Sequence, residues 1–368
     1  MLWNWEQPDW PNFTWDRSRF VQAEEQFLRG AGVLIGGAKH LVEDDRNRLI
    51  VEGMSGEAVT TSAIEGEILS RASVQSSIQR QLGLTSDQHR VPAAEQGISE
   101  LIVDLYRTVP AALTAEMLFG WHGMVMAGRR DVGDVGRYRT SIEPMQVVSG
   151  VLYEPKVHFE APPSQRVPAE MARFIHWFNR TAPYGPEPMP ALARAGVAHL
   201  YFESIHPFED GNGRIGRAIA EKALVQSFGE TILIALGTAI LAHHRRYYDA
   251  LEAANKRNEV SGWLDWFAGV ALEAQRGTIA QVEFLIAKTH LLDRVRGQLN
   301  DRQMKAILRM LEEGPEGFKG GLSAGNYSVI TGAGPSTTTR DLVDLFEKGA
   351  LLRSGERRYA RYRLNLGL

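Results

Sequence analysis

The chain has 368 residues, of which 44% are hydrophobic and 23% are charged, and its net charge is −3. This length predicts two or three domains, and the composition is ordinary for a globular protein with a hydrophobic core. The near-neutral charge argues against a polybasic nucleic-acid binder and against an acidic tail. Because the sequence has no cysteine, disulfides, thiolate metal sites and cysteine nucleophiles are excluded.

The amino-terminal residues predict a cytoplasmic protein. They lack the basic region and apolar stretch of a signal peptide, and we find no uncharged apolar run of 18 residues that would span a membrane. Residues 1–19 are instead rich in tryptophan and proline. Such a composition suits an extended segment whose aromatic side chains anchor it to a neighbour.

Helical periodicity dominates the chain as far as residue 287. The apolar spacing predicts helices within residues 20–82 and at 93–108, 114–126, 169–179, 190–204, 217–228, 242–256 and 263–287. Residues 145–159 differ, because β-branched and aromatic residues there are interrupted by Ser149 and Gly150. This pattern predicts a short β-hairpin that turns at these two residues, inside a mainly α domain.

The tail has another rhythm. An amphipathic helix at 301–313 is followed by a shorter helix at 322–331, a glycine-rich turn, a helix at 335–348 and an alternating segment at 351–364. A helix–turn–helix followed by a two-stranded wing predicts a winged-helix-like domain at residues 291–368.

The most informative segment runs from His206 to Arg217 and reads HPFEDGNGRIGR. It follows an apolar helix and precedes a helix that we expect to begin near Arg214. Gly211 and Gly213 permit backbone conformations that turn successive N–H groups toward one point, at the helix start, where an anion is attracted. Arg214 and Arg217 are three residues apart, so both can face the same phosphate chain.

Two other side chains of this segment suit metal binding and proton transfer. Asp210 offers a hard oxygen ligand to Mg²⁺, which usually takes one or two protein carboxylates together with phosphate oxygens. A histidine, with an ordinary pKa of about 6.5, is the group best able to take a proton from an attacking hydroxyl near neutral pH, and His206 fills that place. Each residue alone fits an ordinary turn or a structural histidine, whereas the complete set indicates a nucleotide site.

The segment resembles, without a gap, the Fic family signature His-Pro-Phe-x-(Asp/Glu)-Gly-Asn-Gly-Arg-x-x-Arg. The resemblance covers roughly residues 54–287 and implies a helical Fic-type core with a β-hairpin flap. It also implies a protein adenylyltransferase, which moves AMP from ATP onto a Tyr, Thr or Ser hydroxyl of a target protein and onto itself. His206 would then be the base, and Asp210 would hold Mg²⁺. The nucleotide phosphates would lie against Gly211, Asn212, Gly213, Arg214, Ile215, Gly216 and Arg217.

Two other segments resemble parts of the same family's site. The hairpin resembles the Fic flap, which pairs with the target by strand addition, and we expect its contacts at Val157, His158 and Phe159. The family's adenosine-side wall, where an aromatic edge and an amide would contact base or ribose, corresponds to Tyr247, Tyr248 and Asn255. For the two tyrosines, plain core packing is the alternative.

A second motif is regulatory by resemblance. Residues 61–66, TSAIEG, resemble the Fic inhibitory pattern (Ser/Thr)-x-x-x-Glu-(Gly/Asn). In the family this glutamate, here Glu65, pairs with the second arginine of the signature, here Arg217, and competes with the γ-phosphate. Residues 10–16 also look like a short amino-terminal module of some bacterial Fic proteins. The expected domains are therefore a Trp-rich and helical region with the inhibitory motif at 1–92, a Fic catalytic core at 93–290 and the winged-helix-like domain at 291–368.

Two further functions stay open at this point. A nucleotide-responsive regulator would bind DNA or protein through the tail, whose predicted wing is basic, with Arg353, Arg357, Arg358, Arg361 and Arg363. Against DNA binding, the helix at 335–348 contains carboxylates that would repel phosphates, namely Asp341, Asp344 and Glu347. The tail would equally serve a homodimer. In a dual enzyme, Glu65 would also orient a water that removes AMP, and the sequence leaves this direction open.

Overall fold

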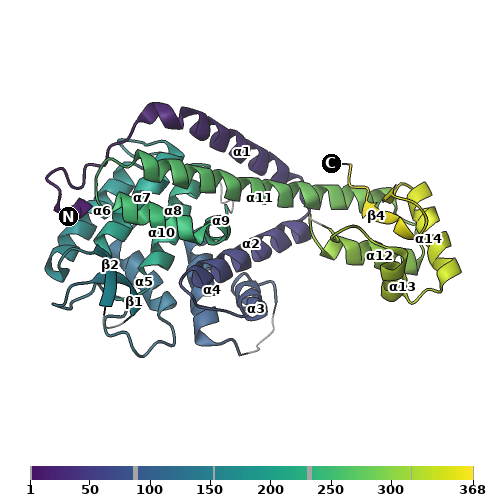
Figure 1. Ribbon diagram of the computed structural model, residues 1–368, viewed down its shortest axis with the longest axis horizontal. Helices are drawn as coiled ribbons and strands as arrows, with labels where there is room; N and C mark the ends of the chain where they lie inside the picture. Colours follow the sequence, from purple (N-terminus) through teal and green to yellow (C-terminus); the bar gives the residue numbers. More distant parts are fainter. Residues whose placement is uncertain (1, 86–89, 152–153, 230–233, 316, 368) are drawn as a thin grey trace. The chain divides into compact units, whose positions relative to one another are not determined.

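The structure, a computed structural model, describes residues 2–85, 90–151, 154–229, 234–315 and 317–367. It has two compact units, one formed by Met1–Ile35 and Asn47–Thr278 and the other by Gly36–Arg46 and Ile279–Leu368. Helices dominate both units (Figure 1), and within the described ranges the strands form two antiparallel hairpins. The predicted mainly α fold is confirmed. None of the described helices combines the length and the apolar character that crossing a membrane requires.

The helices of the first unit follow the predicted order. Those that lie in it wholly or in part are α1 (Val21–Lys39), α2 (Glu43–Ile64), α3 (Arg71–Gln81), α4 (Ala93–Arg107), α5 (Ala115–Val125), α6 (Val167–Arg180), α7 (Ala191–Ile205), α8 (Asn212–Gln226), α9 (Leu236–Ala242), α10 (His244–Ala254) and α11 (Ser261–Arg294). Short 3-10 helices of this unit lie at Asn4–Glu6, Arg17–Phe20 and Ser164–Arg166, and the second unit has one at Arg357–Tyr359. Side-chain caps explain several starts, since Ser70 accepts from Ser73 N and Thr114 accepts from Met117 N.

Two helix boundaries and one additional helix differ from the prediction. Helix α8 begins at Asn212 instead of near Arg214, because Gly211 adopts φ 78° and already serves as the N-cap. Helix α9 was not predicted, since its seven residues are too few to show a helical period. Helix α11 continues to Arg294, beyond the predicted end at residue 287.

The predicted hairpin is present, but the prediction that it turns at Ser149 and Gly150 is wrong. Strand β1 (Gln146–Val151) runs through both residues and pairs antiparallel with β2 (Glu154–Glu160). The pairing continues through Gly150 to Val151, opposite Glu154, so the glycine lies inside the ladder and not in the turn. Residues 152–153, which connect the strands, lie outside the described residues.

Helices α7 and α8 form the centre of the first unit. Every residue of α7 is buried. The two helices approach closely at Gly216, where a Cβ would collide with Glu203 Oε1 and lie 3.2 Å from His199. This packing fixes the end of α7 and the start of α8, and the signature segment lies between them.

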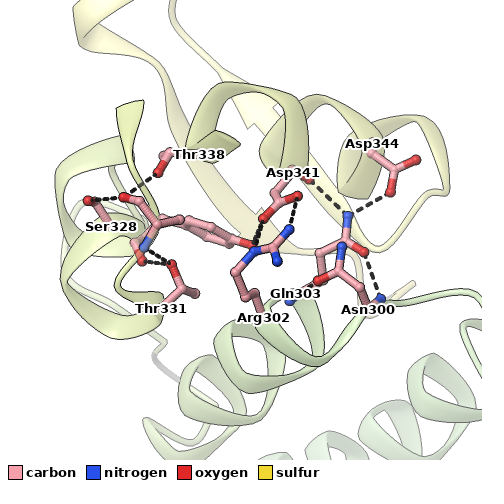
Figure 2. Close-up of polar contacts among 10 residues, drawn as sticks. Asn300, Arg302, Gln303, Ser328, Thr331, Thr338, Asp341 and Asp344 are labelled. Carbon is pink, nitrogen blue, oxygen red and sulfur yellow. Dashed lines mark hydrogen bonds and ion pairs between the residues drawn. The ribbon is translucent and has the colours of Figure 1, made fainter. Parts of the chain in front are cut away.

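The second unit contains α12 (Asp301–Glu312), α13 (Ala324–Thr331), α14 (Pro335–Glu347) and the hairpin β3 (Leu351–Ser354) with β4 (Arg361–Leu364). Figure 2 shows polar contacts that join its three helices. Asp341 is buried and accepts hydrogen bonds from Arg302 and Tyr327, while Asp344 accepts one from Gln303 at 2.6 Å. These two carboxylates, expected to repel phosphates, are therefore paired within the unit. The winged-helix assignment stays a prediction.

Candidate active site

The signature segment forms a tight loop between α7 and α8. His206 caps α7 in the left-handed region, with φ 49°, a conformation that costs a non-glycine residue about 1–3 kcal/mol and often marks a functional site. Asn212 closes the loop, since its side chain donates to Phe208 O at 2.8 Å and accepts from Phe208 N at 2.9 Å. What Asn212 offers an anion at the start of α8 is therefore its backbone N–H, which has no acceptor inside the helix.

His206 is held so that it is neutral near pH 7. Its side chain is 13% exposed. Burial and the positive charge of Arg139 lower the pKa of His206 to about 4, and a hydrogen bond with the backbone of Glu203 opposes this shift only in part. A neutral imidazole can accept a proton, which is the property that a general base needs.

Arg139, which the sequence analysis did not select, holds the backbone around His206. Its Nε donates to His206 O at 2.8 Å, its backbone N donates to Pro207 O at 2.9 Å, and its Nη2 donates to Pro162 O. The side chain is buried. The Arg139 guanidinium thus joins the loop that begins at His206 to the chain that follows the hairpin. The sequence signal that could have found it is the Gly-Arg-Tyr-Arg stretch at 136–139.

The two arginines of the signature lie on α8 and are both buried. Arg217 donates to Thr61 Oγ1 and Thr61 O, each at 2.8 Å. Among the described residues, Arg217 Nη1 and Arg214 Nε have no hydrogen-bond partner. Buried guanidinium groups with free donors at a helix start form a strong anion-binding position.

The carboxylate of Glu65 occupies this anion-binding position. Its Oε1 lies 2.8 Å from Arg217 Nη2, so the structure contains the ion pair that the resemblance implies. The same oxygen lies against Gly213, where an added Cβ would collide with it. Burial alone would lower the pKa of Arg217, but Glu65 keeps this pKa above its ordinary value.

A second carboxylate, which the sequence analysis missed, pairs with the other arginine. Helix α2 ends at Ile64, and Gly66 follows with φ 81°, which reverses the chain so that Glu67 N donates to Ser62 O. Glu67 Oε2 then lies 2.6 Å from Arg214 Nη1. The Glu-Gly-Glu sequence therefore directs two carboxylates onto two arginines.

An acidic cluster anchors α2 farther from the loop. Glu57 is buried and accepts hydrogen bonds from Gly237 N at 2.8 and 3.0 Å. Burial and the neighbouring Glu221 raise the pKa of Glu57 to about 8, so Glu57 is mostly protonated at neutral pH. Glu221 itself accepts from Tyr106 at 2.8 Å and from Ile234 N at 2.8 Å.

The Asp210 carboxylate is accessible to solvent. Its side chain is 43% exposed and lies 2.9 Å from Arg129 Nη1. Within the described part of the chain, no three His, Asp or Glu side chains are grouped as a metal site. A single accessible carboxylate still fits Mg²⁺ in a nucleotide site, since this ion takes most of its other ligands from phosphate and water.

The residues proposed for the adenosine wall differ in their surroundings. Tyr247 is buried, and its OH lies 2.8 Å from His199 Nε2, which favours core packing. Tyr248 is 41% exposed and donates to Ile64 O at 3.3 Å. Asn255 is buried, and its Oδ1 has no hydrogen-bond partner among the described residues, so it can accept one from a ligand.

The three hairpin residues expected to contact the target also differ in their surroundings. Val157 is 38% exposed, whereas Phe159 is buried. His158 lies 2.6 Å from Ser149 Oγ and 2.6 Å from Glu252 on α10.

Two other signature residues serve packing, because Ile215 is fully buried and Gly216 lets α8 approach α7.

Comparison with known proteins agrees with this site. Residues 112–224 match the profile of the Fic/DOC family, and residues 3–84 match a domain of unknown function, DUF4172. The protein adenylyltransferase Fic of Culex quinquefasciatus is 33% identical over 86 residues, which are 23% of this chain and 16% of that protein. The protein adenylyltransferase fic-1 of Caenorhabditis briggsae is 23% identical over 199 residues, which are 53% of this chain and 35% of that protein.

A solved structure extends the likeness along the chain. The crystal structure of a Fic family protein from Desulfovibrio desulfuricans G20 has a TM-score of 0.52 and 23% identity, and the match covers 96% of this chain and 98% of that one. This likeness concerns the fold. The match to the Fic/DOC family thus covers residues 112–224, which include the signature segment, α7 and most of α8. The chain spans 35% or less of the length of these two curated relatives. Their activity is therefore not assigned to the chain on this similarity alone.

Proposed function

We propose that this chain is a protein adenylyltransferase that transfers AMP from ATP to a hydroxyl side chain of another protein. The observation that carries the proposal is the arrangement at the start of α8, where a neutral His206 lies at one end of an anion-binding loop and two buried arginines lie at the other. The printed names of the Culex and Caenorhabditis relatives support the same activity.

The proposed reaction is a displacement at the α-phosphorus. The acceptor hydroxyl gives its proton to His206 as its oxygen bonds to that phosphorus, and the bond to the β-phosphate oxygen breaks to release pyrophosphate. Arg214 and Arg217 balance the charge of the leaving phosphates. Mg²⁺ held by Asp210 would supply further charge neutralisation when bound.

We further propose that Glu65 and Glu67 together inhibit the resting enzyme. Each carboxylate is paired with one of the arginines that would bind the β- and γ-phosphates, Glu65 with Arg217 at 2.8 Å and Glu67 with Arg214 at 2.6 Å. A triphosphate must displace these carboxylates before it can bind in a productive pose. Inhibition of this kind resides in the same chain as the active site and requires no second protein.

The proposal is tested by mass spectrometry after incubation with ATP and Mg²⁺. We expect peptides that carry AMP on a Ser, Thr or Tyr oxygen, either in the chain itself or in a protein of a cell extract. The His206→Ala variant should form none of these peptides. Equal modification by the variant and the wild type would contradict the assignment.

A second candidate function is DNA binding through residues 291–368. The observation that favours it is the internal pairing of Asp341 and Asp344 (Figure 2), which leaves Glu347 as the exposed one of the three carboxylates expected to repel phosphates. Arg340, Arg353 and Arg363 are exposed in this unit. A gel shift of the full chain that weakens with salt would support this candidate, and no shift at low salt would contradict it. The homodimer and the removal of AMP stay predictions.

A further inference from the structure

Residues 3–5 lie beside strand β2 of the hairpin and beside helix α7, which ends directly before His206. Asn4 is completely buried although it is polar. Its Nδ2 donates to Ser204 Oγ at 2.7 Å, and its backbone N donates to Asn255 O at 2.7 Å. Ser204 precedes His206 by two residues on α7, and Asn255 belongs to the expected adenosine wall. One residue therefore contacts both walls of the site, Ser204 through its side chain and Asn255 through its backbone.

The residues on either side of Asn4 contact the end of β2. The Trp3 ring packs edge-to-face on Phe159, with centroids 5.4 Å apart and planes at 76°. Trp5 Nε1 donates to Glu160 O at 2.7 Å. The guanidinium of Arg166 lies over the Trp5 ring at 5.2 Å from its centroid. Both tryptophans thus fix the strand that follows the hairpin turn.

The segment is itself firmly held, which a positioning element requires. Trp10 donates to Glu170 at 3.0 Å and packs edge-to-face on Tyr201, with centroids 5.1 Å apart. Thr14 pairs with the chain before α11, since Thr14 N donates to Asn258 O and Val260 N donates to Thr14 O, each at 2.8 Å. Anchors at residues 10 and 14 leave residues 3–5 little freedom to move away from β2.

We propose that Trp3, Asn4 and Trp5 form a positioning clamp, which holds the end of β2 and the Asn255 wall in register with the catalytic end of α7. The clamp assigns a role to the beginning of the domain of unknown function. It rests on the proposed function, and on the expectation from the flap resemblance that the acceptor protein adds a strand to the hairpin. A fixed β2 would place the acceptor hydroxyl at His206, so the clamp acts on acceptor binding and not on the chemical step.

Hydrogen exchange of the full chain tests the clamp without any need for activity. Trp5→Phe keeps an aromatic ring but removes the indole donor, and Trp3→Leu removes the aromatic edge. We expect amide exchange at residues 156–161 to become roughly two- to tenfold faster in each variant, the range that loss of one modest interaction gives. Trp15→Phe is the matched control. Because Trp15 contacts Arg17, we expect this substitution to leave exchange at 156–161 unchanged.

A transfer assay then asks whether the clamp affects the acceptor. In a Glu65→Gly background, with a His206→Ala copy of the chain as acceptor, Trp5→Phe should raise the acceptor KM several-fold and leave the ATP KM within about twofold. Unchanged exchange at 156–161, or a uniform rise over the whole first unit, would overturn the clamp. An equal change in both KM values would also overturn it. If the Glu65→Gly protein transfers no AMP at all, the proposed function fails, while the exchange result still decides the clamp.

Discussion

Replacing Glu65 with glycine should raise AMP transfer by at least about tenfold. The carboxylate lies 2.8 Å from Arg217 Nη2 and fills the space above Gly213. A hydrogen bond to a charged group contributes about 1.5–3 kcal/mol, which corresponds to roughly 10–150-fold in a competing equilibrium. Because the Glu65 side chain is 32% exposed, solvent weakens the pair, and we expect the lower part of this range.

The same substitution should leave the fold intact. Arg217 retains its two hydrogen bonds to Thr61, so the buried guanidinium keeps neutral acceptors. Residue 65 follows the last residue of α2 and precedes Gly66, so a glycine there interrupts no helix interior. Glu65→Asp should give an intermediate rate, because its shorter side chain reaches the guanidinium poorly.

The assay compares incorporation of labelled AMP by the wild type and by Glu65→Gly. The double variant His206→Ala/Glu65→Gly serves as the silent control, since it removes inhibition and the base together. Calorimetry with ATP confirms that the nucleotide site is intact. A Glu65→Gly protein that folds and binds ATP but is no faster than the wild type would refute self-inhibition by this residue.

Four further predictions follow from the same contacts. His206→Ala should lower transfer by about 10²–10⁴-fold without changing the ATP Kd, and a rate within about tenfold of wild type would remove it as the base. Asp210→Ala should raise the Mg²⁺ concentration needed for half-maximal transfer, and an unchanged titration argues against a metal role. Glu67→Gln, added to Glu65→Gly, should tighten ATP binding several-fold further in calorimetry. The pKa of Glu57 is raised from 4.5 to about 8 in the fold, so its contribution to stability is fully present below pH 4.5 and is lost as the pH rises through 8. Glu57→Gln should remove this loss, so the Tm of the variant relative to that of the wild type should rise between about pH 5 and 8 and then level off.

The local part of the site was predictable because it is contiguous in the sequence. Twelve adjacent residues, 206–217, provide the loop, the helix start and both arginines, so their spacing alone fixes their proximity. The start of α8 was missed by two residues, because the positive φ of Gly211 depends on the loop geometry. Likewise, Gly150 suggests a turn in the sequence but pairs with Pro155 inside the hairpin.

Contacts between distant segments were not predictable in the same way. Glu67 and Arg214 are 147 residues apart, and Trp5 and Glu160 are 155 apart. Helical periodicity shows which face of a helix is buried but does not identify the partner of a polar side chain. The Glu65–Arg217 pair was anticipated only through the family resemblance. The tryptophans of residues 1–19 did predict an anchored segment, and the structure identifies β2, α7 and the chain before α11 as its neighbours.

The central claim is that this site transfers the AMP part of ATP. Its most direct test incubates the Glu65→Gly chain and Mg²⁺ with ATP labelled either at the α-phosphate or at the γ-phosphate. The account predicts label on protein from α-labelled ATP, label in released pyrophosphate from γ-labelled ATP, and neither with His206→Ala/Glu65→Gly. Protein labelled from γ-labelled ATP would identify a phosphotransferase instead, and no label from either substrate would contradict nucleotidyl transfer by this site.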